Sequence, residues 1–177
     1  MKRSKVIALS AVCSAFAILC LTLGAVIEVF DYSAIFMASM CSMIPLAKGS
    51  KLGGVMTYLA TLLLSCIFFV GVRPDLVLTY GIFFGLHPTV NYLLKEKKIN
   101  NILGLVLKTV WFVLSIILIY TLFSGFLFEE SLLTNPTFKK YAYIILAVGG
   151  AMLFVVYDLI INHFQKALDK MIEKLKL

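Results

Sequence analysis

Charged residues are scarce in this chain: Asp, Glu, Lys and Arg make up 14% of its 177 residues, whereas about a quarter is usual in soluble domains. Hydrophobic residues reach 62% and the mean hydropathy is +1.02. This composition excludes an ordinary water-soluble domain, because only short charged turns interrupt the apolar runs between Val6 and Leu168. The bilayer must act as the solvent for most of the chain, so we expect a polytopic membrane protein.

The chain also has few cysteines, and it lacks several common sequence motifs of enzymes. The four cysteines lie inside apolar runs, where they act as small hydrophobic residues rather than as a disulfide framework or a metal site. The chain has no GxxxxGKS/T phosphate loop, no HExxH and no GxSxG. We therefore expect no enzymatic activity, no cofactor and no metal site. The net charge of +7 is explained by lysines at a membrane surface rather than by nucleic-acid binding.

The apolar runs predict an all-α fold in which six transmembrane helices form one bundle. A hydrocarbon core of about 30 Å needs roughly 20 helical residues per crossing, and the chain has room for six in a single transmembrane domain, 1–177. The first run is too long for a signal peptide and predicts a retained helix. The expected spans are 5–27, 32–46, 53–70, 76–94, 102–128 and 138–162, with an amphipathic cytoplasmic tail over 164–177.

The basic residues alternate in abundance from turn to turn, as expected when positive charge is retained in the cytoplasm. When the six expected spans are used to assign each turn to one side of the membrane, both termini fall on the side rich in lysine. Both termini are therefore expected to be cytoplasmic. The acids of the opposite side are Glu28, Asp31, Asp75, Glu129 and Glu130. The basic residues of the cytoplasmic side are Lys2, Arg3, Lys5, Lys48, Lys51, Lys95, Lys97, Lys98, Lys166, Lys170, Lys174 and Lys176.

Polar residues recur along one face of the fourth span. Tyr80, Phe84, His87 and Asn91 fall at i, i+4, i+7 and i+11, and polar groups in lipid must face the bundle or a cavity. Pro88 can bend the helix beside this face. His87 is then either hydrogen-bonded within the bundle or in contact with a transported ligand.

Two charges lie inside predicted spans, Lys108 in the fifth and Asp158 in the sixth. An unpaired charge at a helix centre costs about 2.5 to 3.5 kcal/mol on an insertion scale. Three alternatives stay open: the side chains extend to the membrane surface, they pair with each other, or they serve a function.

The external turns hold most of the remaining ligand candidates, which together would form a lidded mouth. The alternative is that these side chains are merely solvated. Tyr80 and Tyr120 join the mouth because they lie near the outer ends of their spans. The candidates in the turns are Glu28, Asp31, Tyr32, Arg73, Asp75, Asn135, Lys139 and Tyr143.

Small residues recur on the first span along two neighbouring lines. One line holds Ala8, Ala11 and Ala15, and the other holds Ser10, Ser14 and Ala17. Ala11 and Ala15 form an AxxxA step, which allows another helix to approach closely.

The length, the six spans, the first helix KVIALSAVCSAFAIL with its AxxxA step, the glycine-containing entry GSKLGG and the basic amphipathic end together resemble the S components of energy-coupling factor (ECF) transporters. These are substrate-binding membrane subunits of bacterial vitamin and micronutrient importers. The resemblance implies a multi-pass protein of the bacterial cell membrane that captures a small molecule outside. A transmembrane coupling subunit and two ATPases would drive import, with Ala8, Ala11 and Ala15 packing on the coupling subunit.

Two other functions stay open from the sequence. Size and span count also fit a membrane scaffold or accessory protein, such as the MreD-type cell-shape proteins. A third interpretation is a small permease acting alone, with His87 as proton relay.

Overall fold

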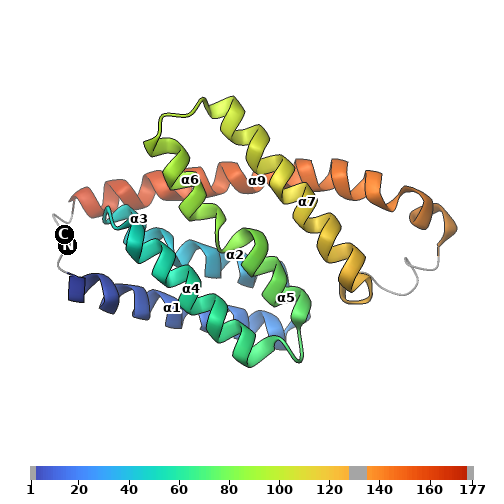
Figure 1. Ribbon diagram of the computed structural model, residues 1–177, viewed down its shortest axis with the longest axis horizontal. Coiled ribbons are helices and arrows are strands. Elements are labelled where there is room, and N and C mark those ends of the chain that lie inside the picture. Colours follow the sequence, from blue (N-terminus) through green and yellow to red (C-terminus); the bar gives the residue numbers. More distant parts are fainter. Residues whose placement is uncertain (1–2, 128–134, 175–177) are drawn as a thin grey trace. The chain divides into compact units, whose positions relative to one another are not determined.

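The computed structural model describes residues 3–127 and 135–174, and in these residues every regular element is helical (Figure 1). Lys2, Glu129, Glu130 and Lys176 lie outside the described residues, as do the side chains of Glu28 and Lys139. The elements are α1 (Arg3–Val26), η1 (Glu28–Phe30), α2 (Asp31–Cys41), α3 (Met43–Ala47), α4 (Lys51–Phe69), α5 (Pro74–Thr79), η2 (Tyr80–Phe84), α6 (His87–Glu96), α7 (Asn101–Leu127) and α9 (Pro136–Lys174).

Within residues 3–127 and 135–174, four helices are long and apolar enough to cross a membrane, which agrees with the expected membrane protein. They are Arg3–Val26, Lys51–Phe69, Asn101–Ser124 and Lys140–Lys174. The runs predicted as the second and fourth spans are each interrupted in the structure. α2 and α3 are separated at Ser42, and η2 and α6 at Gly85 and Leu86.

Proline explains where both interruptions fall. A proline has no backbone N–H, and its ring clashes with the carbonyl group four residues earlier. Pro45 therefore disturbs the helix near Cys41, the last residue of α2, and Pro88 disturbs it near Phe84, the last residue of η2. The helix is thus interrupted at the place where Pro88 was expected to bend it.

The chain divides into two compact units, which are described separately. The first comprises the residues up to Lys98 together with those from Ile160 onward, and the second runs from Ile99 to Leu159. α9 contributes to both, because it continues without a break through the residues predicted as a separate tail, as far as Lys174.

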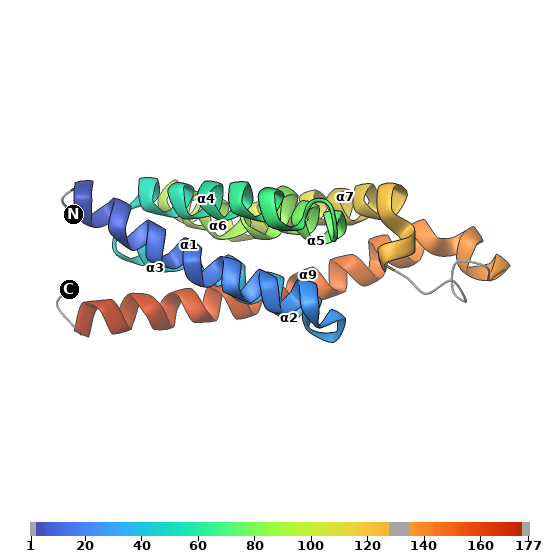
Figure 2. The same ribbon diagram turned by 90° about the horizontal axis from the view of Figure 1, so that it is seen from below.

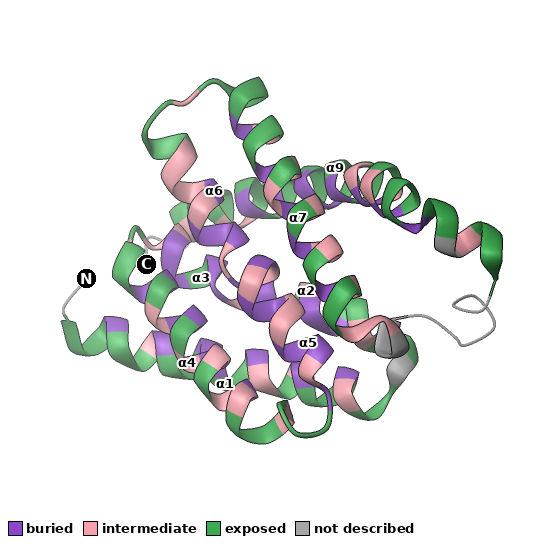
Figure 3. Ribbon diagram, turned by 45° about the vertical axis from the view of Figure 1, so that its right-hand side comes forward, coloured by how far each residue is buried: buried purple, intermediate pink, exposed green. Residues whose placement is uncertain are grey.

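In the first unit α1 packs against α4 through its serine line. The Ser10 hydroxyl donates to the Gly53 carbonyl at 3.0 Å, and the Ser14 hydroxyl is 3.2 Å from the Thr57 carbonyl. Figure 2 shows the same helices from below, and Figure 3 shows how buried and exposed residues alternate along them. The apolar core of this unit consists of Ala17, Leu21, Ile35, Ala38, Tyr58, Leu76 and Tyr80.

The turn before α4 depends on glycine. Gly49 has φ +72°, a conformation that side chains with a Cβ rarely adopt. The next residue, Ser50, caps α4 by accepting a hydrogen bond from the Gly53 amide at 3.1 Å. The turn thus reverses the chain between α3 and α4 within three residues, 48–50.

The second unit contains α7 and the first part of α9. The rings of Phe112 and Phe154 lie 5.5 Å apart, and both side chains are buried. α7 is kinked at Phe123, whose backbone is not helical.

Candidate functional site

Three of the predicted mouth residues meet in one ion cluster at the end of the first unit. The Arg73 guanidinium donates to Asp75 through Nε at 3.1 Å and through Nη2 at 2.9 Å. It also donates to both carboxylate oxygens of Asp31, from Nη1 at 3.3 Å and from Nη2. The cluster therefore joins the turn between α1 and α2 to the turn between α4 and α5.

The ion cluster is shielded from solvent and its charges support one another. The side chains of Arg73, Asp31 and Asp75 are 10%, 18% and 7% exposed. The hydrogen bonds that Arg73 donates to Asp75 and to Asp31 raise the pKa of Arg73, although burial opposes them. Each aspartate lies in the first turn of a helix, Asp31 in α2 and Asp75 in α5, where helix dipoles favour negative charge.

The neighbouring candidate Tyr32 does not join this cluster in the same way, because 62% of its surface is exposed. Glu28 begins η1, but its side chain lies outside the described residues. The end of the first unit therefore contains a closed salt-bridge cluster flanked by an exposed tyrosine.

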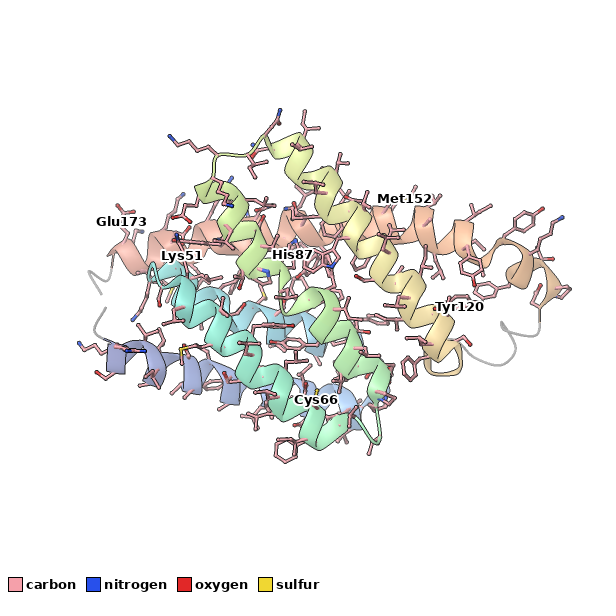
Figure 4. All side chains as sticks on the ribbon, in the orientation of Figure 1. Lys51, Cys66, His87, Tyr120, Met152 and Glu173 are labelled. Carbon is pink, nitrogen blue, oxygen red and sulfur yellow. The ribbon has the colours of Figure 1, made fainter. Side chains whose placement is uncertain are left out.

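The polar face of the fourth predicted span passes through a π-helical turn, η2. A π turn holds one residue more than an α-helical turn, so Gly85 rather than Phe84 follows Tyr80 by one turn, and the Gly85 amide donates to the Tyr80 carbonyl at 2.7 Å. Phe84 is only half-buried, whereas Phe83 is fully buried. His87 lies after the turn, is completely buried, and has its ring centroid 5.2 Å from that of Phe83 (Figure 4). Tyr80, at the start of the turn, is also completely buried.

Tyr58 of α4 contacts the π turn η2 and was not identified from the sequence. Its hydroxyl donates to the Gly81 carbonyl at 2.9 Å, and its ring lies 6.2 Å from that of Tyr80. Gly85 lets these rings come close, since a Cβ there would lie 2.7 Å from the Tyr58 ring and 2.8 Å from the Tyr80 ring. The missing side chain at Gly85 therefore allows α4 to approach the end of η2 closely.

Asn91 belongs to a polar seam between α6 and the end of α9. Its amide nitrogen donates to Asn162 at 3.0 Å and to Gln165 at 3.2 Å, and the Lys95 ammonium donates to Gln165 at 3.3 Å. Sequence reasoning missed Gln165, which is buried. Asn162 and Gln165 were assigned to a span and to a separate tail, whereas α9 continues through both; in one continuous helix their spacing of three residues places them on the same face.

In the second unit Lys108 and Asp158 form an ion pair. The Lys108 Nζ lies 2.5 Å from the Asp158 Oδ1, and both side chains are buried. Of the alternatives left open by the sequence, the structure therefore supports pairing, and neither side chain extends to a surface.

The other mouth candidates also lie in the second unit. The rings of Tyr120 and Tyr143 meet edge to face at 5.7 Å. Asn135 accepts hydrogen bonds from the amides of Thr137 at 2.9 Å and Phe138 at 3.3 Å, so its side chain caps α9. Lys139 lies in α9, but its side chain is outside the described residues.

The two small-residue lines of α1 separate cleanly. Ser10, Ser14 and Ala17 are buried, whereas Ala8, Ala11 and Ala15 are exposed. Large side chains border the exposed alanines, including Val12 at 55% and Phe16 at 61% exposure. We call Ala8, Ala11 and Ala15 the alanine face.

Metal ligands do not cluster in the part of the chain that the structure describes: no three His, Cys, Asp or Glu side chains there could hold one ion. No family model, no curated protein and no solved structure matches the chain.

Proposed function

We propose that the chain is the substrate-specific membrane subunit of an ECF-type importer in the bacterial cell membrane. It captures a vitamin or another micronutrient at the external face and delivers it with a separate coupling subunit and two ATPases. The observation that carries the proposal is the alanine face of α1, which is exposed while the serine line of the same helix packs on α4. Small side chains on an exposed helix face favour close packing with another membrane helix.

The proposal includes six crossings with both termini in the cytoplasm. The two interrupted segments, α2–α3 and α5–η2–α6, cross in addition to the four long helices. Broken helices are tolerated at membrane depth when protein covers them. The buried Tyr80 and His87 support this arrangement for the fourth crossing, and the distribution of lysine between the turns supports the orientation.

In this arrangement Asp31, Arg73 and Asp75 lie at the external end of the first unit. Substrate capture at this end requires the ion cluster to separate or to admit the ligand beside it. Energy for release comes from the partner ATPases, in keeping with a sequence that has no phosphate-binding loop of its own.

The proposal is tested with two matched tryptophan pairs at i and i+4. One variant combines Ala11→Trp with Ala15→Trp on the alanine face, and the control combines Leu59→Trp with Leu63→Trp on α4, where both leucines are exposed. Each protein is purified gently from its native membrane, and its partners are identified by mass spectrometry. We expect ATPase subunits with the unmodified protein and the α4 pair, and their loss from the α1 pair.

Retention of the ATPases by the α1 pair would contradict the proposed interface. Copurified proteins without any ATPase, and without a retained small molecule, would favour a scaffold. Transport by the purified chain alone in vesicles without ATP would favour a solitary permease.

A further inference from the structure

In the two turns joined by the ion cluster, the arrangement of charged and apolar side chains is the opposite of that expected for a turn in water. The charged side chains of Arg73, Asp31 and Asp75 are largely covered and pair with one another, while six apolar residues, which we call the apolar rim, are exposed. Val29 is 90% exposed and Val72 is 69% exposed. The apolar rim consists of Val26, Ile27, Val29, Phe30, Val70 and Val72.

A turn in water is expected to have the opposite arrangement. Lys, Arg, Asp and Glu are almost always solvated in water-facing segments, and contiguous exposed apolar side chains indicate contact with another apolar phase. Here Arg73 and both of its carboxylate partners are at least four-fifths covered. The polarity therefore indicates that something other than water surrounds these turns.

The lengths of the adjacent helices indicate which phase, other than water, surrounds the two turns. Lys51, at the start of α4, pairs with Glu96 at 2.7 Å, and both side chains are about half exposed, which places this end in water (Figure 4). From there the nineteen residues of α4 rise about 28 Å, slightly less than the hydrocarbon thickness of about 30 Å. The turn after Phe69 therefore lies at or inside the far boundary of the hydrocarbon.

The segment formed by α2 and α3 leads independently to the same depth in the membrane. α2 and α3 have 11 and 5 residues and together rise about 25 Å between Asp31 and the turn that contains Lys48. Tilting would bring both ends deeper. Asp31 thus lies inside the hydrocarbon boundary, where only a paired carboxylate is tolerated.

We propose that the apolar rim is a lipid-binding surface, embedded among the acyl chains of one leaflet just below the headgroups. The ion cluster favours this position, because it pairs the charges of Arg73, Asp31 and Asp75 within the protein. This inference concerns the membrane alone and holds whether or not the chain carries a substrate.

The experiment uses tryptophan fluorescence of the full chain in phosphatidylcholine vesicles. Trp111→Phe removes the single native tryptophan, and Val29→Trp or Val72→Trp then supplies one reporter in the rim. Leu63→Trp, on the exposed middle of α4, is the lipid control. Lys97→Trp, on the exposed turn after α6, is the water control. Quenching is measured with lipids brominated near the headgroup and with iodide in the buffer.

Both rim reporters should be quenched by lipid brominated near the headgroup at least as strongly as Leu63→Trp, and should show a Stern–Volmer constant for iodide severalfold below that of Lys97→Trp. Iodide quenching of either reporter at the level of Lys97→Trp would overturn the proposal. Protection from both quenchers would also overturn it, because protein rather than lipid would then cover the rim. None of these outcomes depends on ATPase binding. The experiment therefore tests the lipid-binding surface independently of the proposed importer function.

Discussion

Replacing Arg73 by methionine tests the ion cluster most directly. Arg73→Met keeps an unbranched chain of similar length but leaves the carboxylates of Asp31 and Asp75 facing each other, 18% and 7% exposed. Removing one partner of a buried ion pair costs about 3–5 kcal/mol. We expect the free energy of unfolding, measured by reversible unfolding in mixed detergent micelles, to fall by about that amount.

Two comparisons separate this effect from loss of packing. Neutralising the whole cluster, with Asp31→Asn and Asp75→Asn added to Arg73→Met, should cost less than Arg73→Met alone, because no unpaired charge remains. Val72→Ala, at an exposed neighbour, should change stability by no more than about 0.5 kcal/mol. A cost below about 1 kcal/mol for Arg73→Met, as for a surface ion pair, would refute the reasoning.

The pH dependence of the same measurement has a defined sign. The folded state raises the pKa of Arg73 above its ordinary value, so the stabilisation by its charge is complete below the unfolded pKa and is lost only as pH rises through the folded pKa. The pKa of an unfolded arginine already lies above the accessible alkaline range. Arg73 therefore stays charged at every working pH, and moderate alkalinity should leave its contribution unchanged.

Lys108→Met and Asp158→Asn should each lower the free energy of unfolding by about 3–5 kcal/mol, and the double variant by less than their sum; an additive double variant would show that the pair at 2.5 Å contributes no coupling. Gly85→Ala should cost about 1–3 kcal/mol, because its Cβ would lie 2.7 Å from the Tyr58 ring. Gly71→Ala, where no atom lies within 4 Å, is the matched control. Equal thermal stability of the two alanine variants would contradict the close approach.

The membrane character and the helical fold follow from composition, because the absence of charge over long runs is a property of the chain itself. Pro88 likewise locates its own bend, since the missing N–H acts only within one turn. The partner of Arg73 was not foreseen: Asp31 is 42 positions away, and no local pattern specifies which turns meet.

The displacement of Phe84 from the predicted face has a different origin. The i, i+4, i+7 spacing assumes 3.6 residues per turn, whereas η2 contains a π turn. The sequence YGIFFG of Tyr80 to Gly85 has no residue that distinguishes a π turn from an α turn in advance. The two lines of small residues on α1 posed a similar problem, since spacing identified both lines but not which one α4 would bury.

The π turn also gives the fourth helix an unusual tolerance to a change in chain length. The turn holds one residue more than an α-helical turn, so deleting one residue from the segment 80–84 would let it close as regular α-helix. His87 and Asn91 would then keep nearly their present orientation. A one-residue deletion within the regular helix α5 would instead rotate everything after it by about 100° and exchange the whole set of side chains presented by α6.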